Sequence, residues 1–406
     1  MTARTADLVV VGAGVMGAWT ALRALEDGRD TLLVDAFGPG DARATSSEAS
    51  RLSRASHGTD EWYARWSRLA REDWIALGGE TNEPLFIPTG VAWLAHREGG
   101  FESASLATLT RLGIPVERLT PEDAGHRWPA LATEDLAFVV HEPEAGVLRA
   151  ARGVGATVGA FARRGGHDLV GRVRPGRVEA SRLLDIVADD GARLVADAFV
   201  FAAGPWLPRL FPELLGNFIA VTKQDVLYFG RATDGPSFEP PHFPAWIDYD
   251  RAFYGTPALD GHGPKVAPDA YGRVFDPDTE DRLVDPASVD RTREFLAGRF
   301  PDLASRPVVE TRVCQYESTP DTHFLIDRHP DLENVWLVGG GSGHGFKHGP
   351  QIGRHVAELL NGSGFGPADG RFSLHRGSAG GPALRSGGST PRPTQSPLPT
   401  VPGTNR

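Results

Sequence analysis

The sequence predicts an α/β fold built on a parallel sheet, and two apolar runs near the N-terminus support this prediction. Residues 8–11, Leu-Val-Val-Val, are typical of a strand buried on both faces. A helix is expected over 18–25, ended by Gly28, and a second strand over 31–35. A strand, a helix and a strand connected this closely form a βαβ unit, in which the two strands are parallel.

Composition and charge narrow the class of protein. The chain has 406 residues, of which 40% are hydrophobic and 23% charged, and this length predicts roughly two to three domains. The formal net charge of -10 argues against a nucleic-acid partner. No apolar run reaches the roughly 18 residues of a membrane span, and no signal peptide precedes the first strand. We therefore expect a cytoplasmic protein without membrane or nucleic-acid contacts.

The cysteine and histidine content bears on metal sites and disulfides. Cys314 is the single cysteine, which excludes an internal disulfide and a cysteine-cluster zinc site. The 13 histidines include no His-Glu-x-x-His pattern. We predict that the protein binds no metal.

Farther along the chain, periodicity and glycines predict more elements. Large apolar residues recur at three- and four-residue intervals and predict a helix that ends at Gly78-Gly79, with its tryptophans forming a packed stripe rather than a substrate cage. Two short strands are expected over 194–204, and one strand runs into glycines over 335–341. Residues 377–406 are rich in Gly, Pro, Ser and Thr and predict a disordered tail. The helical stripe comprises Trp62, Trp66, Leu69, Ala70, Trp74 and Leu77.

A Gly-x-Gly-x-x-Gly motif lies between the first strand and the first helix. Gly12 permits the turn, Gly14 permits close approach of a diphosphate, and Gly17 lets the helix pack on the strand. Val15 and Met16 lie between the second and third glycines, just before the predicted helix, whose free N–H groups favour a negatively charged diphosphate. An acid, Asp35, follows 23 residues after Gly12 and suits a ribose hydroxyl. This pattern predicts FAD or NAD rather than NADP.

The sequence resembles the flavin-dependent amine oxidases of the D-amino-acid-oxidase superfamily, especially the monomeric sarcosine oxidase and N-methyltryptophan oxidase branch. The resemblance runs from about residue 7 to about residue 376 and is carried by 12–17 with 32–37, by 46–54, by 254–265 and by 314–347. It implies a Rossmann-like FAD-binding domain formed by 1–84, 146–218 and 323–360. It also implies a mixed-sheet substrate and catalytic domain formed by 85–145, 219–322 and 361–376. The predicted fold class is therefore α/β (α+β).

The resemblance implies which residues bind FAD. It places a covalent thioether to the flavin at Cys314, where basic neighbours such as Arg312 favour the reactive thiolate. It places Arg51 beside the flavin ring. The other cofactor residues that it implies are Ser46, Ser47, Gly204, Gly341, Gly343, Gly345, Phe346 and Lys347.

The resemblance also implies substrate-binding and catalytic residues. Arg54 and Lys347 match residues that hold a substrate carboxylate, for which a guanidinium is a fitting planar donor. Tyr254 and Tyr316 match aromatic residues of the catalytic site. Lys265 matches the lysine that activates oxygen, and Arg51 belongs to the same catalytic group.

Two positions depart from the family pattern. Asp269 stands four residues beyond Lys265, where close sarcosine oxidases have a histidine, and Ser47 replaces another histidine. A carboxylate at Asp269 would repel a substrate carboxylate and attract a cationic amine. Sarcosine is therefore not fixed as the substrate.

The resulting prediction is a monomeric FAD-dependent oxidase of secondary amines. Its small-molecule substrates would be sarcosine-like N-methyl or cyclic amino acids, and oxygen would be reduced to hydrogen peroxide. The alternatives are a flavin-dependent dehydrogenase that passes electrons to a partner, and a biosynthetic flavin oxidase that acts on an unusual amine. A non-catalytic flavin-binding module is a further class, and so is an NAD-dependent dehydrogenase, which flavin absorbance would exclude.

Overall fold

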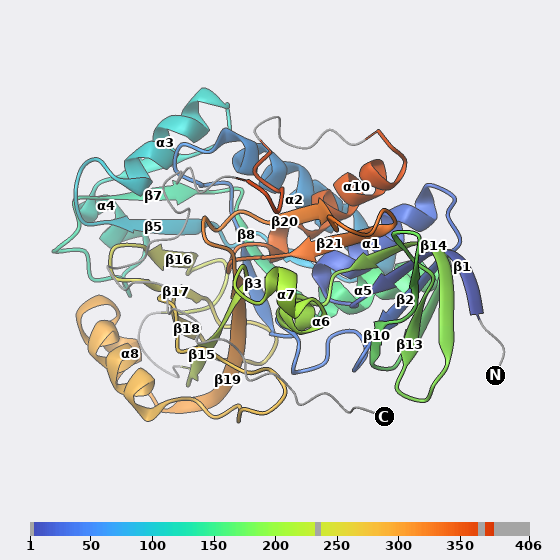
Figure 1. Ribbon diagram of the computed structural model, residues 1–406. Coiled ribbons are helices and arrows are strands. Elements are labelled where there is room, and N and C mark those ends of the chain that lie inside the picture. The colour runs from blue at the N-terminus through green and yellow to red at the C-terminus, as the bar shows by residue number, and fades with distance from the viewer. Residues whose placement is uncertain (1–3, 232–236, 364–369, 377–406) are drawn as a thin grey trace.

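A computed structural model describes residues 4–231, 237–363 and 370–376 of the chain. Two eight-stranded sheets dominate it, the first on the right of Figure 1 and the second on the left. The predicted tail, 377–406, lies outside the described residues. Within the described part of the chain, no helix is both long enough and apolar enough to span a membrane.

The predicted βαβ unit is confirmed. It consists of β1 (Arg4–Val11), α1 (Val15–Glu26) and β2 (Thr31–Asp35), and the two strands pair in parallel. Leu8, Val9 and Val10 are fully buried, as expected for a strand covered on both faces. The helix begins three residues earlier than predicted, because Gly14 has an extended backbone and acts as its N-cap.

The first sheet is largely parallel around β1. Its order is β10-β13-β14-β1-β2-β9, with β21 also paired to β14 and β20 to β21. We predict two short strands over 194–204, but β14 is one strand of nine residues. In its first half, which pairs with β13, buried residues alternate with less buried ones. Its last three residues are fully buried between β1 and β21, so the change in burial pattern along the strand resembles a break between two strands. The remaining strands are β9 (His167–Val170), β10 (Val173–Pro175), β13 (Asp185–Ala188), β14 (Arg193–Phe201), β20 (Leu325–Arg328) and β21 (Val335–Gly339).

Four helices pack together beside the first sheet: α1 and α5 (Ala150–Arg163) contact its strands, and α2 (Glu61–Thr81) and α10 (Gly349–Leu360) pack on these two helices. The predicted tryptophan helix is α2, and Trp74 is fully buried, although Leu69 is 47% exposed and lies outside the stripe. The predicted stop at Gly78-Gly79 is wrong. The helix ends at Asn82, whose left-handed backbone (φ 52°) caps it. Gly78 instead lets the following turn approach, since a Cβ there would lie 2.8 Å from the carbonyl oxygen of Glu83.

The second sheet is mixed, as predicted. Its order is β19-β15-β18-β17-β16-β5-β7-β6, and the pair β16–β5 is parallel while its other pairs are antiparallel. Its strands are β5 (Val91–Ala95), β6 (Glu117–Leu119), β7 (Phe138–Glu142), β15 (Ala220–Phe229), β16 (Ala245–Asp248), β17 (Phe253–Thr256), β18 (Lys265–Pro268) and β19 (Val308–Ser318). Helices α3 (Phe101–Arg111), α4 (Pro121–Arg127) and α8 (Pro286–Arg299) flank it. The short elements are α6 (Leu207–Leu210), α7 (Pro212–Leu215), α9 (Pro301–Ala304) and the hairpin β11 (Val178–Glu179) and β12 (Arg182–Leu183).

A small antiparallel sheet links the two large ones. It has the order β3-β8-β4, with β3 at Ser50–Ser53, β8 at Gly146–Arg149 and β4 at Phe86–Ile87. The strands of the first large sheet fall within 1–84, 146–218 and 323–360, and those of the second fall within 85–145 and 219–322. The domain boundaries themselves stay a prediction.

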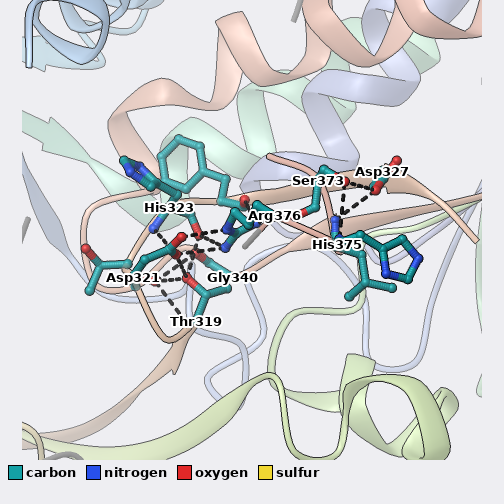
Figure 2. A network of polar contacts seen from close by, with 12 residues as sticks. Thr319, Asp321, His323, Asp327, Gly340, Ser373, His375 and Arg376 are labelled. Atoms are coloured by element: carbon teal, nitrogen blue, oxygen red, sulfur yellow. Dashed lines mark hydrogen bonds and ion pairs between the residues drawn. The ribbon is translucent and has the colours of Figure 1, made fainter. Parts of the chain in front are cut away.

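The segment 370–376 is anchored by the polar network of Figure 2. Arg376 donates to both carboxylate oxygens of Asp321 (2.7 and 2.9 Å), and Ser373 donates to Asp327 (2.9 Å). We predict 361–376 in the second domain. Phe372 lies instead in the same hydrophobic core as α1 and Trp74, so 370–376 packs with the first sheet.

Candidate active site

A cavity of about 390 Å³ lies at the carboxyl ends of β1, β2 and β14. The first turn of α1 and the loop 341–347 line one side, and Tyr254 and Tyr316 of the second sheet line the other. In open α/β sheets, ligands bind outside the carboxyl ends of the strands. This cavity is therefore the candidate site.

Glycines shape the turn that opens onto the cavity. Gly12 has φ +106°, and a Cβ there would lie 2.3 Å from the carbonyl oxygen of Ala202 on the neighbouring chain segment. A Cβ on Gly17 would lie 1.8 Å from the carbonyl oxygen of Gly12, so Gly17 serves the packing of helix on strand. Gly14 lines the cavity itself. The first N–H of the helix, on Val15, donates to the Ser46 hydroxyl (3.1 Å).

Asp35 lies at the end of β2, where the sequence places a ribose partner. One of its oxygens accepts from the N–H of Ala13 (2.7 Å), and the other accepts from the N–H groups of Phe37 (2.8 Å) and Gly38 (2.9 Å). These bonds fix the carboxylate at the cavity wall, where the oxygen that accepts only from Ala13 still has a lone pair for a hydroxyl.

Sequence reasoning missed the end of the cavity beyond Asp35. Phe37 and Trp206 face each other there, with ring centroids 5.4 Å apart, and the guanidinium of Arg172 lies 4.9 Å from the Phe37 ring. Arg172 follows β9 and Trp206 follows β14, so their positions just after strand ends were the available signal. Arg174, Arg209 and Asp278 line the same end.

Two buried polar atoms of the wall indicate a polar ligand. The hydroxyl of Thr45 and one carboxylate oxygen of Glu317 have no hydrogen-bond partner among the residues that the structure describes, and both residues line the cavity. Burial raises the pKa of Glu317 to about 7. An elongated ligand with hydroxyl, amide and diphosphate groups, such as FAD, fits a wall of this composition.

Most of the predicted cofactor residues line the cavity. Three do not: Gly17 packs the helix, the Ser47 hydroxyl donates to the carbonyl oxygen of Ala44 (2.7 Å), and Cys314 lies behind the wall. Cys314 meets the wall through Arg51. The predicted residues that line it are Gly12, Gly14, Val15, Met16, Asp35, Ser46, Arg51, Gly204, Gly341, Gly343, Gly345, Phe346 and Lys347.

Arg51 connects the cavity wall to Cys314. Its guanidinium lies 3.1 Å from the cysteine sulfur and donates to the carbonyl oxygen of Thr45 (2.7 Å). We predict Arg312 as a cation that favours the thiolate, but its guanidinium donates to Glu310 (2.7 Å). The cation in contact with the sulfur is therefore Arg51.

Lys265 lies one layer behind the cavity wall. Its side chain is fully buried, and its Nζ lies 5.3 Å from the centroid of the Tyr254 ring and donates to the carbonyl oxygen of Ser50 (3.0 Å). Burial lowers the pKa of Lys265 well below its usual value, and the charge of Arg51 lowers it further. Its predicted role in oxygen activation stays a prediction.

The two predicted carboxylate-binding cations line the same cavity as Tyr254. Arg54 is buried over the ring of Trp93, 4.9 Å from its centroid, and Lys347 is buried with its Nζ 3.0 Å from the carbonyl oxygen of His344. Glu142, which the sequence did not indicate, accepts from the Trp93 indole (2.9 Å) and from the N–H of Ala55 (2.7 Å). This carboxylate thereby fixes the surface on which Arg54 rests.

Three buried histidines meet beside these cations, although their spacing matches no metal motif. Nitrogen atoms of His57, His344 and His348 all lie within 4.8 Å of one another. Burial and the charges of Lys347 and Arg54 lower the pKa values of His57 and His348 well below 6.5. Neutral imidazoles are good metal ligands, but the two cations oppose a divalent ion. The absence of a bound metal stays a prediction.

Asp269 reaches the cavity wall through a tyrosine. The hydroxyl of Tyr316 donates to its carboxylate (3.1 Å), and Tyr316 lines the cavity. Tyr254, the other lining tyrosine, is held neutral, because burial raises its pKa well above 10. The residues predicted for substrate and catalysis thus line one cavity, with Lys265 and Asp269 in the layer behind it.

Comparison with known proteins identifies the family of this chain. Residues 7–359 match the family described as DAO, FAD dependent oxidoreductase. A monomeric sarcosine oxidase of Bacillus sp. (strain NS-129) is 28% identical over 358 residues, which cover 87% of this chain and 92% of that protein. An N-methyl-L-tryptophan oxidase of Yersinia pestis (strain Pestoides F) is 28% identical over 381 residues, which cover 91% and 99%. The crystal structure of L-proline dehydrogenase from P. horikoshii has a TM-score of 0.81 at 20% identity and covers 92% and 98%.

Proposed function

This chain belongs to the FAD-dependent oxidoreductase family and is of the sarcosine oxidase type, which acts on CH–NH groups, and on that premise we propose that it is an oxidase of secondary amines. Its substrates would be N-methyl or cyclic amino acids. The observation that carries this proposal is that Arg54 and Lys347 line the same cavity as Tyr254 and Tyr316.

FAD, when bound, supplies the redox chemistry: it accepts a hydride from the carbon next to the amine nitrogen and returns two electrons, with two protons, to oxygen as hydrogen peroxide. The chain supplies binding and orientation. Asp35 and the first turn of α1 suit the ribose and diphosphate, and the loop 341–347 and Arg51 suit the flavin end. We propose that Cys314 forms the covalent link, with Arg51 favouring its thiolate.

The substrate end of the cavity favours an anionic group. Arg54 and Lys347 are both buried. Burial lowers the pKa values of neighbouring His57 and His348, and the charges of Lys347 and Arg54 lower them further, as expected where the potential is positive. A substrate carboxylate is the group that such a potential binds, while its amine is directed to the reacting edge of the cofactor. Tyr254, held neutral, and Tyr316 present rings and hydroxyl groups to the rest of the substrate.

A panel of amines tests this proposal. Purified enzyme should produce hydrogen peroxide with at least one of sarcosine, N-methyltryptophan, proline and pipecolate, with one peroxide per amine oxidised. An uncharged N-methylamine is the control and should react much more slowly. Flavin absorbance without peroxide or dye reduction on any amine would contradict an amine-oxidising function.

A dehydrogenase is the second candidate, favoured by the likeness in fold to an L-proline dehydrogenase. It would oxidise the same class of amine but pass the electrons to a partner other than oxygen. Turnover with an artificial electron acceptor, at a rate far above that with oxygen, would favour this candidate. A cytoplasmic location and a monomeric state are parts of the proposal that size measurement and fractionation test.

A further inference from the structure

All three lysines of this chain are buried. The sequence has 42 lysine and arginine residues, but its lysines are only Lys223, Lys265 and Lys347, with exposed fractions of 7%, 0% and 3%. A buried ammonium is costly unless it is paired and hydrogen-bonded. The partner of the most buried one, Lys265, is therefore informative.

That partner is Glu48, a residue that neither the sequence motifs nor the proposed function uses. Glu48 lies just before β3 and is 7% exposed. One of its carboxylate oxygens lies 3.2 Å from the Nζ of Lys265 and accepts from the hydroxyl of Tyr228 (3.2 Å). Its other oxygen pairs with the guanidinium of Arg51. The Glu48 carboxylate thus links Lys265, which lies behind the cavity wall, to Arg51, which lies in the wall.

The charge of Lys265 depends on this contact. Burial and Arg51 both lower its pKa, and the other titratable groups that face this cluster are Tyr254 from β17, Tyr228 from β15 and Cys314 from β19. Of these groups the two tyrosines are neutral, since burial raises their pKa values. The charge of Cys314 would raise the pKa of Lys265, but under the proposed function its sulfur is bonded to the flavin and carries no charge. The Glu48 carboxylate, 3.2 Å away, is then the negative group in contact with this ammonium.

We propose that Glu48 is a positioning residue for the reaction with oxygen: its carboxylate keeps the Lys265 side chain charged and directed toward the wall that Arg51 and Tyr254 form. This inference rests on the proposed oxidase function. A cation near the reacting oxygen stabilises the negative charge that develops as oxygen accepts electrons. Glu48 itself acts only through Lys265 and Arg51.

The first test measures the charge of Lys265 directly in flavin-loaded enzyme. With ¹³Cε-labelled lysine, the protein gives three lysine signals, and Lys265→Met identifies the one of interest. In the wild type this signal should be that of a charged ammonium at pH 7.5. In Glu48→Gln, which keeps shape and hydrogen bonds but removes charge, it should be that of a neutral amine. A neutral Lys265 in the wild type would overturn the inference, even if Glu48→Gln does not fold.

The second test measures the reaction of the reduced enzyme with oxygen. Glu48→Gln should slow it by at least about tenfold at pH 7.5, the scale of losing part of one charge-stabilising contact. The rate should recover as the pH is lowered and Lys265 gains a proton. In a Lys265→Met background, Glu48→Gln should have a much smaller effect, because the group through which it acts is gone. Equal effects in both backgrounds would overturn the inference.

Two further variants separate charge from structure. Glu48→Asp keeps the carboxylate and should leave Lys265 charged, with an oxygen rate between those of the wild type and Glu48→Gln. A purely structural role predicts that Asp is as harmful as Gln. Asp248→Asn removes a different fully buried, ion-paired carboxylate in the second sheet and should leave the pH profile unchanged. If the wild type gives no peroxide although Lys265 responds to Glu48→Gln as expected, the oxidase function fails, and the assignment of Glu48 to oxygen chemistry is overturned with it. If the wild type does give peroxide but Glu48→Gln reacts with oxygen at an unchanged rate, only the inference about Glu48 is overturned.

Discussion

The guanidinium of Arg51 lies 3.1 Å from the sulfur of Cys314, although 263 positions separate the two residues in the sequence. A cation in contact with a thiol stabilises its thiolate, and the thiolate is the nucleophilic form of cysteine. Arg51 also lines the cavity. The contact therefore supplies a physical reason for flavin attachment at this cysteine.

We expect Cys314→Ser to release its flavin. After acid precipitation, wild-type protein should keep its yellow colour in the pellet, because the cofactor is covalently bound. The serine variant should lose all flavin to the supernatant, since a hydroxyl is far less nucleophilic than a thiolate. Absorbance of pellet and supernatant at the flavin maximum measures the result, and free flavin from the wild type would contradict attachment.

A matched pair of arginine variants tests the role of the neighbouring cation. Arg51→Ala should slow attachment when flavin is added to cofactor-free protein, because the thiolate loses its partner. Arg312→Ala should not, since that side chain is paired with Glu310. Equal slowing in both variants would contradict the assignment to Arg51.

The sequence predicted the elements whose pattern is local. The strands around Val9 and Leu33 are apolar on both faces, and Gly12, Gly14 and Gly17 mark the turn between strand and helix, so the βαβ unit could be read from short stretches. The end of α2 could not be predicted from Gly78-Gly79, because the helix stops where Asn82 adopts a left-handed backbone rather than where glycine first occurs.

The missed site residues depend on contacts between distant segments. Glu48 meets Lys265 and Glu142 meets Ala55 only after the small sheet brings β3 beside β8. His57 and His348 meet only when α2 and the last helix pack against each other. No periodicity in one stretch records such pairs, so the part of the site held by long-range ion pairs lay outside what the sequence could predict.

Arg54→Ala should impair amino-acid substrates selectively. A charged contact of this kind is worth roughly 2–5 kcal/mol when one partner is removed. The apparent KM for the best amino-acid substrate should therefore rise by orders of magnitude, with little change for an N-methylamine that has no carboxylate. Steady-state peroxide assays on both substrates measure the ratio. Arg71→Ala, at an arginine paired with Glu144, is the control and should change neither. Equal loss on both substrates would make Arg54 a flavin-binding or structural residue.

Glu317→Gln should change how stability depends on pH. Burial raises the pKa of Glu317 in the folded protein from 4.5 to about 7, so folding favours its protonated form. This stability is fully present below pH 4.5 and is lost as the pH rises to about 7, at a cost of about 3 kcal/mol. The glutamine variant, which cannot ionise, should therefore gain stability relative to the wild type at pH 8 and little at pH 4.5. Urea unfolding at both pH values measures this difference. Glu213→Gln, at an exposed glutamate, is the control, and a difference that does not vary with pH would contradict the raised pKa.

Asp269→His should shift substrate preference toward sarcosine, because it removes a negative charge that lies just behind the cavity wall. Its carboxylate accepts a hydrogen bond from the Tyr316 hydroxyl (3.1 Å), so its negative charge lies one residue behind the wall that carries Arg54 and Lys347. A negative charge there opposes a substrate carboxylate by about 1 kcal/mol, a factor of roughly five in kcat/KM. The variant should therefore gain about fivefold on sarcosine and proline relative to an uncharged N-methylamine. Tyr316→Phe, which removes the hydrogen bond but keeps the charge, separates the two effects and should not reproduce this gain. If Asp269→His leaves the ratios of kcat/KM between substrates unchanged, the aspartate does not influence substrate choice. Sarcosine then becomes the expected substrate.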